Sequence, residues 1–494
     1  MPKNSELIPY LKDVVNIVKK PTKTSSGVAV VAVMSSPAKC PHGRCVPCPG
    51  GPESIFESPQ SYTGLEPAAR RGRESGFDPY VQCVRRLSQL EKMGHPITKV
   101  KLIVMGGTFT ARPLEYQRWF VGEALRAMNE YVVNDGEQNI NTQPRSQGAM
   151  SESELERIKN ENADAGVRCV GITLETRPDW ADEKRIDDIL SLGTTKVEIG
   201  VQSIYEDVLA RIKRGHGVKE VIEANRALRD SCLKVGFHIM PGLPGSSLDR
   251  DVEMMKELFS SEDFRPDHLK IYPTLVLEDT ELYEWWKKGE YKPFDIEDGI
   301  EFLCAVKQIL PPWVRISRIQ RDIPSNLVVA GIKKSNLRQI VKEEMKKRGL
   351  RCRCIRCREV GYYGGKVSPE LRVESYEVCG GVENFISYED VEKDVLVGFL
   401  RLRYPCSPHR PELTNSALVR ELHVYGRMVD VGKLPSDKEW QHRGAGAMLL
   451  ERAEMMAEDE GFKRIAVMSG VGVRRYYESL GYRREGPYMV KDLG

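Results

Sequence analysis

A regular alternation of apolar, β-rich runs and helical segments between residues 75 and 320 constrains the fold of this chain more than any other feature. The apolar runs lie at Lys99–Met105, Cys169–Leu174, Lys196–Val201, Lys234–Met240, His268–Tyr272 and Val314–Ser317. Helical spacing recurs at Pro79–Lys92, Leu155–Ala165, Glu183–Leu192, Val218–Asp230, Leu248–Phe259 and Ile296–Ile309. This order predicts an α/β fold with a parallel sheet that helices cover. About six units suit a partial, TIM-like (β/α) barrel better than a full barrel of eight strands.

A cluster of cysteines lies ahead of this series. Cys40, Cys45 and Cys48 form a Cys-x4-Cys-x2-Cys run in the loop after the apolar stretch Gly27–Met34. Three thiolates can hold three irons of a 4Fe–4S cluster, and the fourth iron is then open to chelation by S-adenosylmethionine (SAM). The spacing alone is equally compatible with zinc, and ordinary buried thiols are a third interpretation. His42 lies too close to the first cysteine to complete a zinc site comfortably.

Glycines and polar residues follow the predicted strands. In barrels of parallel strands the chemistry collects at these carboxyl ends. Gly106 and Gly107 follow the first strand of the series, and without side chains they let the backbone approach the amino group of a bound SAM. Glu175 and Gln202 end the next two strands and are candidate SAM contacts, with plain surface-loop residues as the alternative. The glycine pair favours the cluster over zinc at the cysteine run.

Length and charge limit the remaining possibilities. A chain of 494 residues is expected to form two or three domains. No apolar run is long enough to span a membrane, and no export signal is evident, so we expect a cytoplasmic protein whose 12 cysteines include metal ligands. The net charge of +3 conceals two basic blocks, residues 1–48 and 333–358. Such blocks favour a nucleic-acid partner, with a solvated basic face as the alternative.

The last third of the chain carries a second nucleotide-binding pattern. Strands are expected at Leu396–Arg403, Leu418–Val424, Ile465–Met468 and Tyr488–Lys491, and helices at Ala447–Glu460 and Gly472–Leu480. The sequence Gln441-x-x-Gly444-x-Gly446 precedes the long helix, and its free backbone N–H groups suit a pyrophosphate. This resembles the signature of the GNAT acyltransferases, although glycines that cap a helix by chance would look the same.

The GNAT resemblance implies an acetyl-CoA site. The residues that it assigns to acetyl-CoA are Glu421, Leu422, His423 and Val424 on the strand, Gly444, Ala445 and Gly446 at the helix start, and Tyr477 near the thioester sulfur.

A second cysteine cluster lies between the two patterns. Cys352, Cys354 and Cys357 fall within six residues and indicate a zinc-stabilised loop. The fourth ligand is open, with Cys379, Cys406 and His409 as candidates. A further Fe–S cluster and unligated thiols are the alternatives.

Taken together, these motifs resemble one family along nearly the whole chain. The segments that carry the resemblance are Val-Met-Gly-Gly-Thr-Phe (104–109), Glu-Thr-Arg-Pro-Asp (175–179), Glu-Ile-Gly-Val-Gln-Ser (198–203), Arg-Gly-His (214–216), Gln-Arg-Asp-Ile-Pro (320–324) and Arg-Glu-Leu-His-Val-Tyr-Gly (420–426). The chain resembles the catalytic subunit of Elongator, in the single-subunit form of archaea and bacteria. On this basis we expect a basic tRNA-binding segment (1–26), a radical SAM domain (27–325), a basic zinc-binding linker (326–370) and a GNAT domain (371–494).

The resemblance implies carboxymethylation of carbon 5 of the wobble uridine, position 34, in the anticodon loop of tRNA. A deoxyadenosyl radical takes hydrogen from the acetyl methyl group of acetyl-CoA, the carbon radical adds to uracil, and thioester hydrolysis leaves the carboxymethyl group. It also implies that Arg168 contacts coenzyme A. Because the two reacting carbons must meet, we expect the coenzyme A site to face the barrel mouth.

Other residues are placed in this scheme by position. Lys270 and Tyr272, with Arg315 and Arg318, are candidates for lining the uridine cleft, and the first two are the candidate catalytic residues beside Tyr477; structural ion pairing is the alternative for each. Lys19, Lys20 and Lys23 are expected to bind tRNA phosphates.

Two other functions compete with this one. The first is a protein lysine acetyltransferase in which the barrel is a scaffold, and the second is a non-catalytic tRNA-binding module. The intact cysteine run argues against the first, and the glycines at both cofactor sites argue against the second. The resemblance is compatible with a chain that acts without accessory subunits, and it leaves the oligomeric state open.

Overall fold

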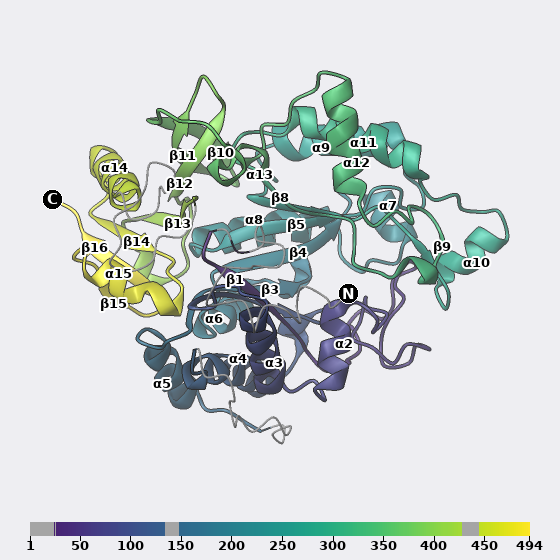
Figure 1. Cartoon of the computed structure of the whole chain (residues 1–494), viewed down its shortest axis with the longest axis horizontal. Coiled ribbons are helices and arrows are strands. Elements are labelled where there is room, and N and C mark those ends of the chain that lie inside the picture. Colours follow the sequence, from purple (N-terminus) through teal and green to yellow (C-terminus); the bar gives the residue numbers. More distant parts are fainter. Residues whose placement is uncertain (1–23, 25, 134–147, 427–443) are drawn as a thin grey trace, which may run out of the picture.

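The computed structural model describes residues 24, 26–133, 148–426 and 444–494, and in them the chain forms two large sheets (Figure 1). The first sheet is parallel throughout, in the order β1-β2-β3-β4-β5-β6-β8. Its strands are β1 (Ala29–Met34), β2 (Lys99–Met105), β3 (Arg168–Thr176), β4 (Lys196–Gln202), β5 (Lys234–Ile239), β6 (His268–Ile271) and β8 (Arg315–Ile319). Since β1 and β8 do not pair, the barrel is open, as the sequence predicts.

Helices cover the outside of this sheet, where its strands present apolar side chains. The helices of this part of the chain are α2 (Pro67–Glu74), α3 (Pro79–Lys92), α4 (Leu114–Glu130), α5 (Glu152–Asn162), α6 (Glu183–Ser191), α7 (Glu206–Arg211), α8 (Val218–Asp230), α9 (Leu248–Ser260) and α11 (Ile296–Ile309), while α10 (Glu281–Lys287) lies away from the sheet. Several of them start where the sequence supplies a cap. The Asp78 side chain accepts a hydrogen bond from the N–H of Val81 at the start of α3, and Ser247 caps α9 in the same way.

The second sheet is mixed and lies in the C-terminal third, in the order β10-β11-β12-β13-β14-β16-β15. Its strands are β10 (Glu370–Val378), β11 (Gly381–Asp390), β12 (Val395–Tyr404), β13 (Ser416–Val424), β14 (Arg464–Val467), β15 (Arg483–Glu485) and β16 (Tyr488–Asp492). Helix α14 (Ala445–Asp459) packs on it, and α15 (Arg474–Glu478) follows β14. Only β13 and β14 are parallel neighbours, and they pair only over Ser416–Val419, so residues 420–424 of β13 extend beyond β14.

Two short helices, α12 (Leu337–Lys347) and α13 (Ile355–Arg358), connect the sheets, and a small antiparallel pair, β7 (Val276–Leu277) and β9 (Val328–Ala330), lies beside α10. The connection contains the basic block 333–358, and part of its charge is neutralised. Arg348 pairs with Glu301 and Glu344, and the buried Arg358 pairs with Glu389. The block is therefore less positive than its sequence indicates.

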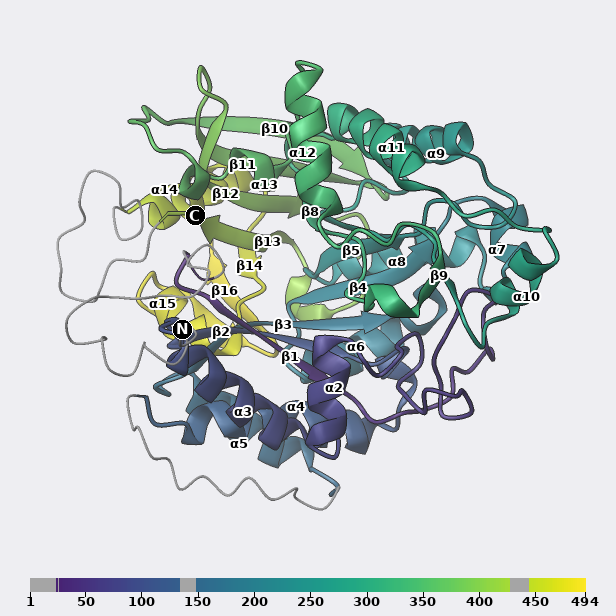
Figure 2. The same cartoon turned by 45° about the vertical axis from the view of Figure 1, so that its right-hand side comes forward.

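The C-terminal sheet packs against the amino ends of the barrel strands (Figures 1 and 2). His268 begins β6 and lies 3.5 Å from Glu421 of β13. Arg420 donates to the backbone oxygen of Leu233, just before β5, at 2.9 Å. The sequence predicts that the coenzyme A site faces the barrel mouth, but the strand assigned to that site, β13, lies at the amino ends, opposite the carboxyl ends that form the mouth.

Buried charges join the two sheets. The Arg420 guanidinium donates to both carboxylate oxygens of Asp267, at 2.7 and 2.8 Å, and to Glu383 at 2.7 Å. Arg403 donates to Asp230 of α8 at 2.7 Å. We call the full set the interface ion cluster: Arg229, Arg401, Arg403, Arg420, Asp230, Asp267, Glu383 and Glu421. Because a buried charge needs partners, the cluster fixes how the two sheets sit together.

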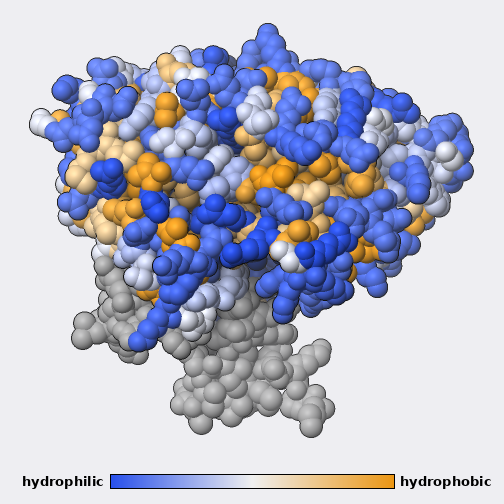
Figure 3. Space-filling view, turned by 90° about the horizontal axis from the view of Figure 1, so that it is seen from above, coloured by the Kyte–Doolittle hydropathy of each residue, from blue (hydrophilic) through white to orange (hydrophobic). Residues whose placement is uncertain are grey.

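Among the described residues, no helix is long and apolar enough to cross a membrane. The face shown in Figure 3 is largely hydrophilic, and its hydrophobic residues form several separate patches.

Candidate active site

A pocket opens at the carboxyl ends of the barrel strands. It is lined by residues from the ends of six strands, from the segment 61–68 after the cysteine run and from the loop between α7 and α8: Ser61, Tyr62, Glu66, Pro67, Ala68, Met105, Gly107, Glu175, Thr176, Arg177, Gly200, Gln202, Arg214, His238, Met240, Tyr272, Arg318, Arg321 and Asp322. This is the edge at which parallel barrels place their chemistry. Gly107, Glu175 and Gln202, all named from the sequence as SAM contacts, lie together here.

The cysteine run lies beside this pocket, and its sulfur spacing favours a cluster over a single ion. In a tetrahedral zinc site with Zn–S bonds of about 2.3 Å, sulfur atoms lie roughly 3.8 Å apart. The sulfurs of Cys40, Cys45 and Cys48 do not form a group with all members within 4.8 Å, whereas those of the second cysteine cluster do. The three thiols are nevertheless near enough to interact: Cys45 and Cys48 both help to raise the pKa of Cys40, behind the larger effect of burial. The residues therefore fit a cluster with several irons.

Each of the three sulfurs has a polar neighbour. The Cys40 sulfur lies 3.4 Å from the hydroxyl of Thr108, and the amide of Gln60 donates to the Cys48 sulfur at 2.9 Å. His42, which the sequence excludes as a zinc ligand, has its Nε2 atom 3.0 Å from the Cys45 sulfur. Hydrogen bonds to the ligand sulfurs are one of the means by which proteins adjust Fe–S clusters.

The glycines after β2 are required by the local backbone. Gly106 and Gly107 have φ values of 131° and 86°, where other residues are strained. A Cβ atom on Gly106 would lie 2.1 Å from the Ser35 hydroxyl, and one on Gly107 would lie 3.0 Å from the Gln60 side chain. Without side chains at these two positions, the backbone after β2 can lie close to Ser35 and Gln60, which flank the cysteine loop.

Gln202 is also held in an unusual conformation. Its φ is 70°, and its buried Oε1 atom has no hydrogen-bond partner in the part of the chain that the structure describes. A buried polar atom without a partner is costly. Gln202 therefore suits a role in which a ligand supplies the missing donor.

A row of charged side chains runs along the inside of the barrel below the pocket. The Lys196 ammonium lies 2.6 Å from Glu198, Lys270 lies between Glu198 and Glu175, and Tyr62 donates to Glu175 at 2.8 Å. We call Lys196, Glu198, Lys270 and Glu175 the interior charge row. Burial alone would raise the pKa of Glu175, but Lys270 and His238 together outweigh it and lower that pKa. The two carboxylates raise the pKa of Lys270 well above its usual value against the effect of burial.

These contacts define what Lys270 and its neighbours can do. Lys270 stays charged between two carboxylates, so it is an ion-paired residue rather than a free base, in agreement with the alternative given above. Tyr272 and Arg318 do line the pocket, and burial raises the pKa of Tyr272. Arg315 does not, because it lies at the amino end of β8 and donates to Glu359 and to the Tyr425 hydroxyl. Its assignment to the uridine cleft is therefore wrong.

The proposed acetyl-CoA strand lies at the other end of the barrel. Glu421 of β13 faces the barrel and contacts His268, while Leu422 and Val424 pack on the opposite side with the α14 core. Although burial acts to raise the pKa of Glu421, His268 and Arg401 hold it well below its usual range. His423 lies 4.3 Å from the Tyr425 ring, and burial lowers its pKa to about 4. At neutral pH this strand thus presents a carboxylate and an uncharged imidazole toward the barrel.

The start of α14 carries the second part of this site. Gly444 has a φ of 80°, and a Cβ atom on Gly446 would lie 3.0 Å from the Tyr476 hydroxyl. Tyr476 is 41% exposed, whereas Tyr477 is buried in the core behind α14. The structure thus brings Tyr476, which the sequence did not single out, next to Gly446; Gln441 lies outside the described residues.

Arg168 lies where the two parts of the protein meet. It begins β3, and a Cβ atom on Gly472 would lie 2.7 Å from its own Cβ. Arg168 is therefore next to the short helical turn Val471–Val473 of the C-terminal third. The lysines assigned to tRNA phosphates, Lys19, Lys20 and Lys23, lie outside the described residues.

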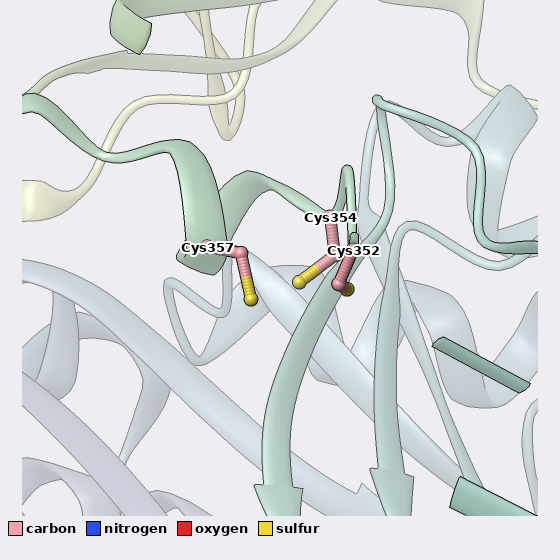
Figure 4. Close-up of side chains that lie close together, drawn as sticks. All are labelled: Cys352, Cys354 and Cys357. Atoms are coloured by element: carbon pink, nitrogen blue, oxygen red, sulfur yellow. The ribbon is translucent and has the colours of Figure 1, made fainter. Parts of the chain in front are cut away.

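Cys352, Cys354 and Cys357 form the tighter sulfur group (Figure 4). The described residues contribute no fourth Cys, His, Asp or Glu to it. The Lys307 ammonium lies 3.5 Å from the Cys357 sulfur. Three sulfurs at this spacing can hold one metal ion.

The three candidates for a fourth ligand lie elsewhere, so these assignments are wrong. The Cys379 sulfur lies 3.1 Å from the Asn225 amide, the Cys406 sulfur 3.2 Å from Asp230, and the His409 ring 2.9 Å from Asp187. The reason is the course of β10, a strand of nine residues whose length of roughly 30 Å carries the chain away from the linker.

Comparison with known proteins assigns both halves of the chain. Residues 35–258 match the radical SAM superfamily, 266–347 its C-terminal domain, and 425–492 the acetyltransferase (GNAT) domain. A protein described as tRNA uridine(34) acetyltransferase from Methanocaldococcus infernus is 51% identical over 100% of this chain and 92% of its own length. Human Elongator complex protein 3 is 45% identical over 99% of this chain and 87% of its own length.

A solved structure agrees with this assignment. The archaeal Methanocaldococcus infernus Elp3 lacking residues 1–46 covers 95% of this chain and 100% of its own, with 47% identity and a TM-score of 0.80. The match extends across the barrel, the linker and the C-terminal sheet.

Proposed function

This chain belongs to the family of Elongator complex protein 3 and the archaeal tRNA uridine(34) acetyltransferases, and on that premise we propose that it modifies the wobble uridine of tRNA. The reaction is the conversion of uridine 34 to 5-carboxymethyluridine, with acetyl-CoA as the carbon source. One observation carries the proposal. A single chain joins a radical SAM barrel with a pocket to an acyltransferase domain, and buried ion pairs hold the two together.

The radical SAM family implies a 4Fe–4S cluster and SAM, and the GNAT domain implies acetyl-CoA. We assign the cluster to Cys40, Cys45 and Cys48. When bound, the cluster supplies the electron that cleaves SAM to a deoxyadenosyl radical. Gly106 and Gly107 leave room for the amino acid end of SAM, and Gln202 and Glu175 offer polar contacts inside the pocket.

At the other site, we assign acetyl-CoA to Glu421–Val424, to the start of α14 at Gly444–Gly446, and to Arg168. The helix start supplies backbone N–H groups for the pyrophosphate. We still propose that Tyr477 lies near the thioester. The hydroxyl group beside Gly446, however, belongs to its exposed neighbour Tyr476. Glu421 stays ionised at neutral pH, and we propose that its carboxylate, which lies beside His268 and Arg401, orients a water molecule at the acyl group.

The tRNA is expected at the mouth, where Tyr272, Arg318 and Arg321 lie around the pocket. A base that is flipped out of the anticodon loop would enter there. We further propose that Cys352, Cys354 and Cys357 bind zinc, that the chain acts in the cytoplasm on its tRNA substrate, and that it needs no accessory subunit for the chemistry.

The experiment is an anaerobic incubation of the reduced, iron-loaded protein with tRNA, acetyl-CoA and SAM, followed by mass analysis of the nucleosides. Carboxymethyluridine is the expected product, and Cys45→Ser should abolish it while tRNA binding persists. Normal product from Cys45→Ser would exclude the cluster assignment. Acetyl-lysine on protein without any modified uridine would instead support the lysine acetyltransferase.

A further inference from the structure

A buried arginine faces the cysteine run. Arg214 lies in the loop between α7 and α8 and is 8% exposed. One of its nitrogens, Nη1, lies 3.6 Å from the Cys45 sulfur, and Nη2 donates to the Gly200 oxygen at 2.6 Å. Its Nε atom lies 3.0 Å from His216. The guanidinium is therefore held on three sides, with one of those sides directed at a cluster ligand.

The surrounding backbone is shaped to keep this arrangement. Gly215 has a φ of 74°, and a Cβ atom there would lie 2.8 Å from the Cβ of His42. The N–H of Val46 donates to the Ile212 oxygen at 3.0 Å, which ties the cysteine loop to the end of α7. The loop that carries Arg214 and the loop that carries the cysteines thus form one packed unit.

Arg214 has no carboxylate partner within 4.0 Å among the residues that the structure describes. Its neighbour Arg177 is different, since it donates to both oxygens of Asp179, at 2.8 and 2.9 Å. A buried cation is costly unless an anion lies beside it. A cluster bound to the Cys45 thiolate, which lies 3.6 Å from Arg214, can supply this anion.

The sign of the effect follows from the charges. Three thiolates and an oxidised cluster core of charge 2+ give a net charge of 1−, and uptake of one electron gives 2−. A fixed cation at the ligand sulfur stabilises the more negative, reduced state. Thr108 and Gln60 act on the other two sulfurs as neutral neighbours, and a charged hydrogen bond is roughly twice as strong as a neutral one.

We propose that Arg214 is a positioning residue that sets the reduction potential of the cluster, raising it so that a low-potential one-electron donor can reduce it. The inference rests on the cluster assignment in the proposed function but not on the tRNA reaction. Charge near a cluster and hydrogen bonds to its sulfurs are recognised determinants of its potential. Arg214 also lines the SAM pocket, so the competing role is a contact to the SAM carboxylate.

The test is a potentiometric titration of the full-length, iron-loaded protein, followed by electron paramagnetic resonance in the absence of SAM. We expect Arg214→Gln to retain its iron and to lower the equilibrium constant for reduction at least tenfold, a shift of about 59 mV for one electron. Arg214→Lys keeps the charge and should shift less. Lys213→Gln removes an exposed cation of the same loop, which pairs with Glu281, and should leave the potential unchanged.

A midpoint potential in Arg214→Gln equal to that of the unmodified protein, at equal iron content, would overturn the proposal. The proposal would then yield to the SAM-carboxylate role, which predicts weaker SAM binding at an unchanged potential. Should Arg214→Gln lose its iron, Arg214→Lys decides. In Arg214→Lys, a decrease of less than tenfold in the equilibrium constant for reduction supports the role of charge. A larger decrease, or loss of iron, shows that the geometry of the guanidinium matters instead of its charge. Failure of the tRNA reaction in either variant does not bear on these measurements.

Discussion

Removal of one carboxylate from the interface ion cluster should destabilise the protein strongly. Asp267 is fully buried, and it accepts hydrogen bonds from Arg420 at 2.7 and 2.8 Å, from Arg229 at 3.3 Å and from the N–H of Val235 at 2.8 Å. A third arginine, Arg401, also lies near Asp267. The substitution Asp267→Asn keeps the shape of the side chain but removes the negative charge that these three arginines share. Breaking a buried ion pair from one side costs about 3–5 kcal/mol.

The assay is the free energy of unfolding from urea titration, read by tryptophan fluorescence, since Trp313 lies at this interface with its backbone oxygen 2.6 Å from Arg401. The matched control is Glu253→Gln, which removes an exposed ion pair with Lys256 and should cost at most about 1 kcal/mol. The double variant Asp267→Asn with Arg420→Met restores the balance of charge and should recover part of the loss. If Asp267→Asn is as stable as the Glu253→Gln control, the reasoning about buried charge is refuted.

Three further predictions concern other parts of the molecule. Cys354→Ser should abolish zinc binding, measured by elemental analysis, and leave the iron content unchanged, because the two sulfur groups are separate; loss of both metals would contradict this separation. Reversal of Lys19, Lys20 and Lys23 to Glu should weaken tRNA binding and reduce its salt dependence, and an unchanged salt slope would remove this segment from the binding surface. Since the pKa of Asp267 is held well below its usual range by nearby arginines against the effect of burial, its stabilising contribution should be fully present above the unfolded pKa of about 3.9 and be lost as the pH falls through the folded value. A loss of this contribution, measured as the difference between the unmodified protein and Asp267→Asn, already between pH 7 and 5 would contradict that shift.

The barrel strands were well predicted because most of their side chains are buried. Such strands appear as continuous apolar runs that end in glycine or polar residues, and β2 was predicted to the residue, as were the helices α3, α8 and α11. The strand β10 escaped notice because its side chains are mostly exposed and mostly polar, so that no apolar run marks it. The helix α4 and the strand β11 were also missed, although most of their side chains are buried.

The placement of the C-terminal sheet could not be inferred from the sequence. It depends on pairs such as Arg420 with Asp267, which lie 153 positions apart and whose sequence neighbours give no sign of the contact. The same is true of Arg214, which was quoted only as part of a family motif. The role proposed for Arg214 depends on its contact with the sulfur of Cys45, a residue 169 positions away in the sequence.

The packing of the C-terminal sheet on the amino ends of the barrel places the strand β13 and the pocket at opposite ends of the barrel strands. Under the proposed function, tRNA and SAM bind at the carboxyl ends of the strands and coenzyme A binds at the amino ends, so the large ligands do not compete for the same space. The interior of the barrel lies between these two proposed sites, and it holds the interior charge row, from Lys196 at the start of β4 to Glu175 at the pocket. Buried ion pairs, rather than apolar side chains, therefore separate the pocket from the acyltransferase strand.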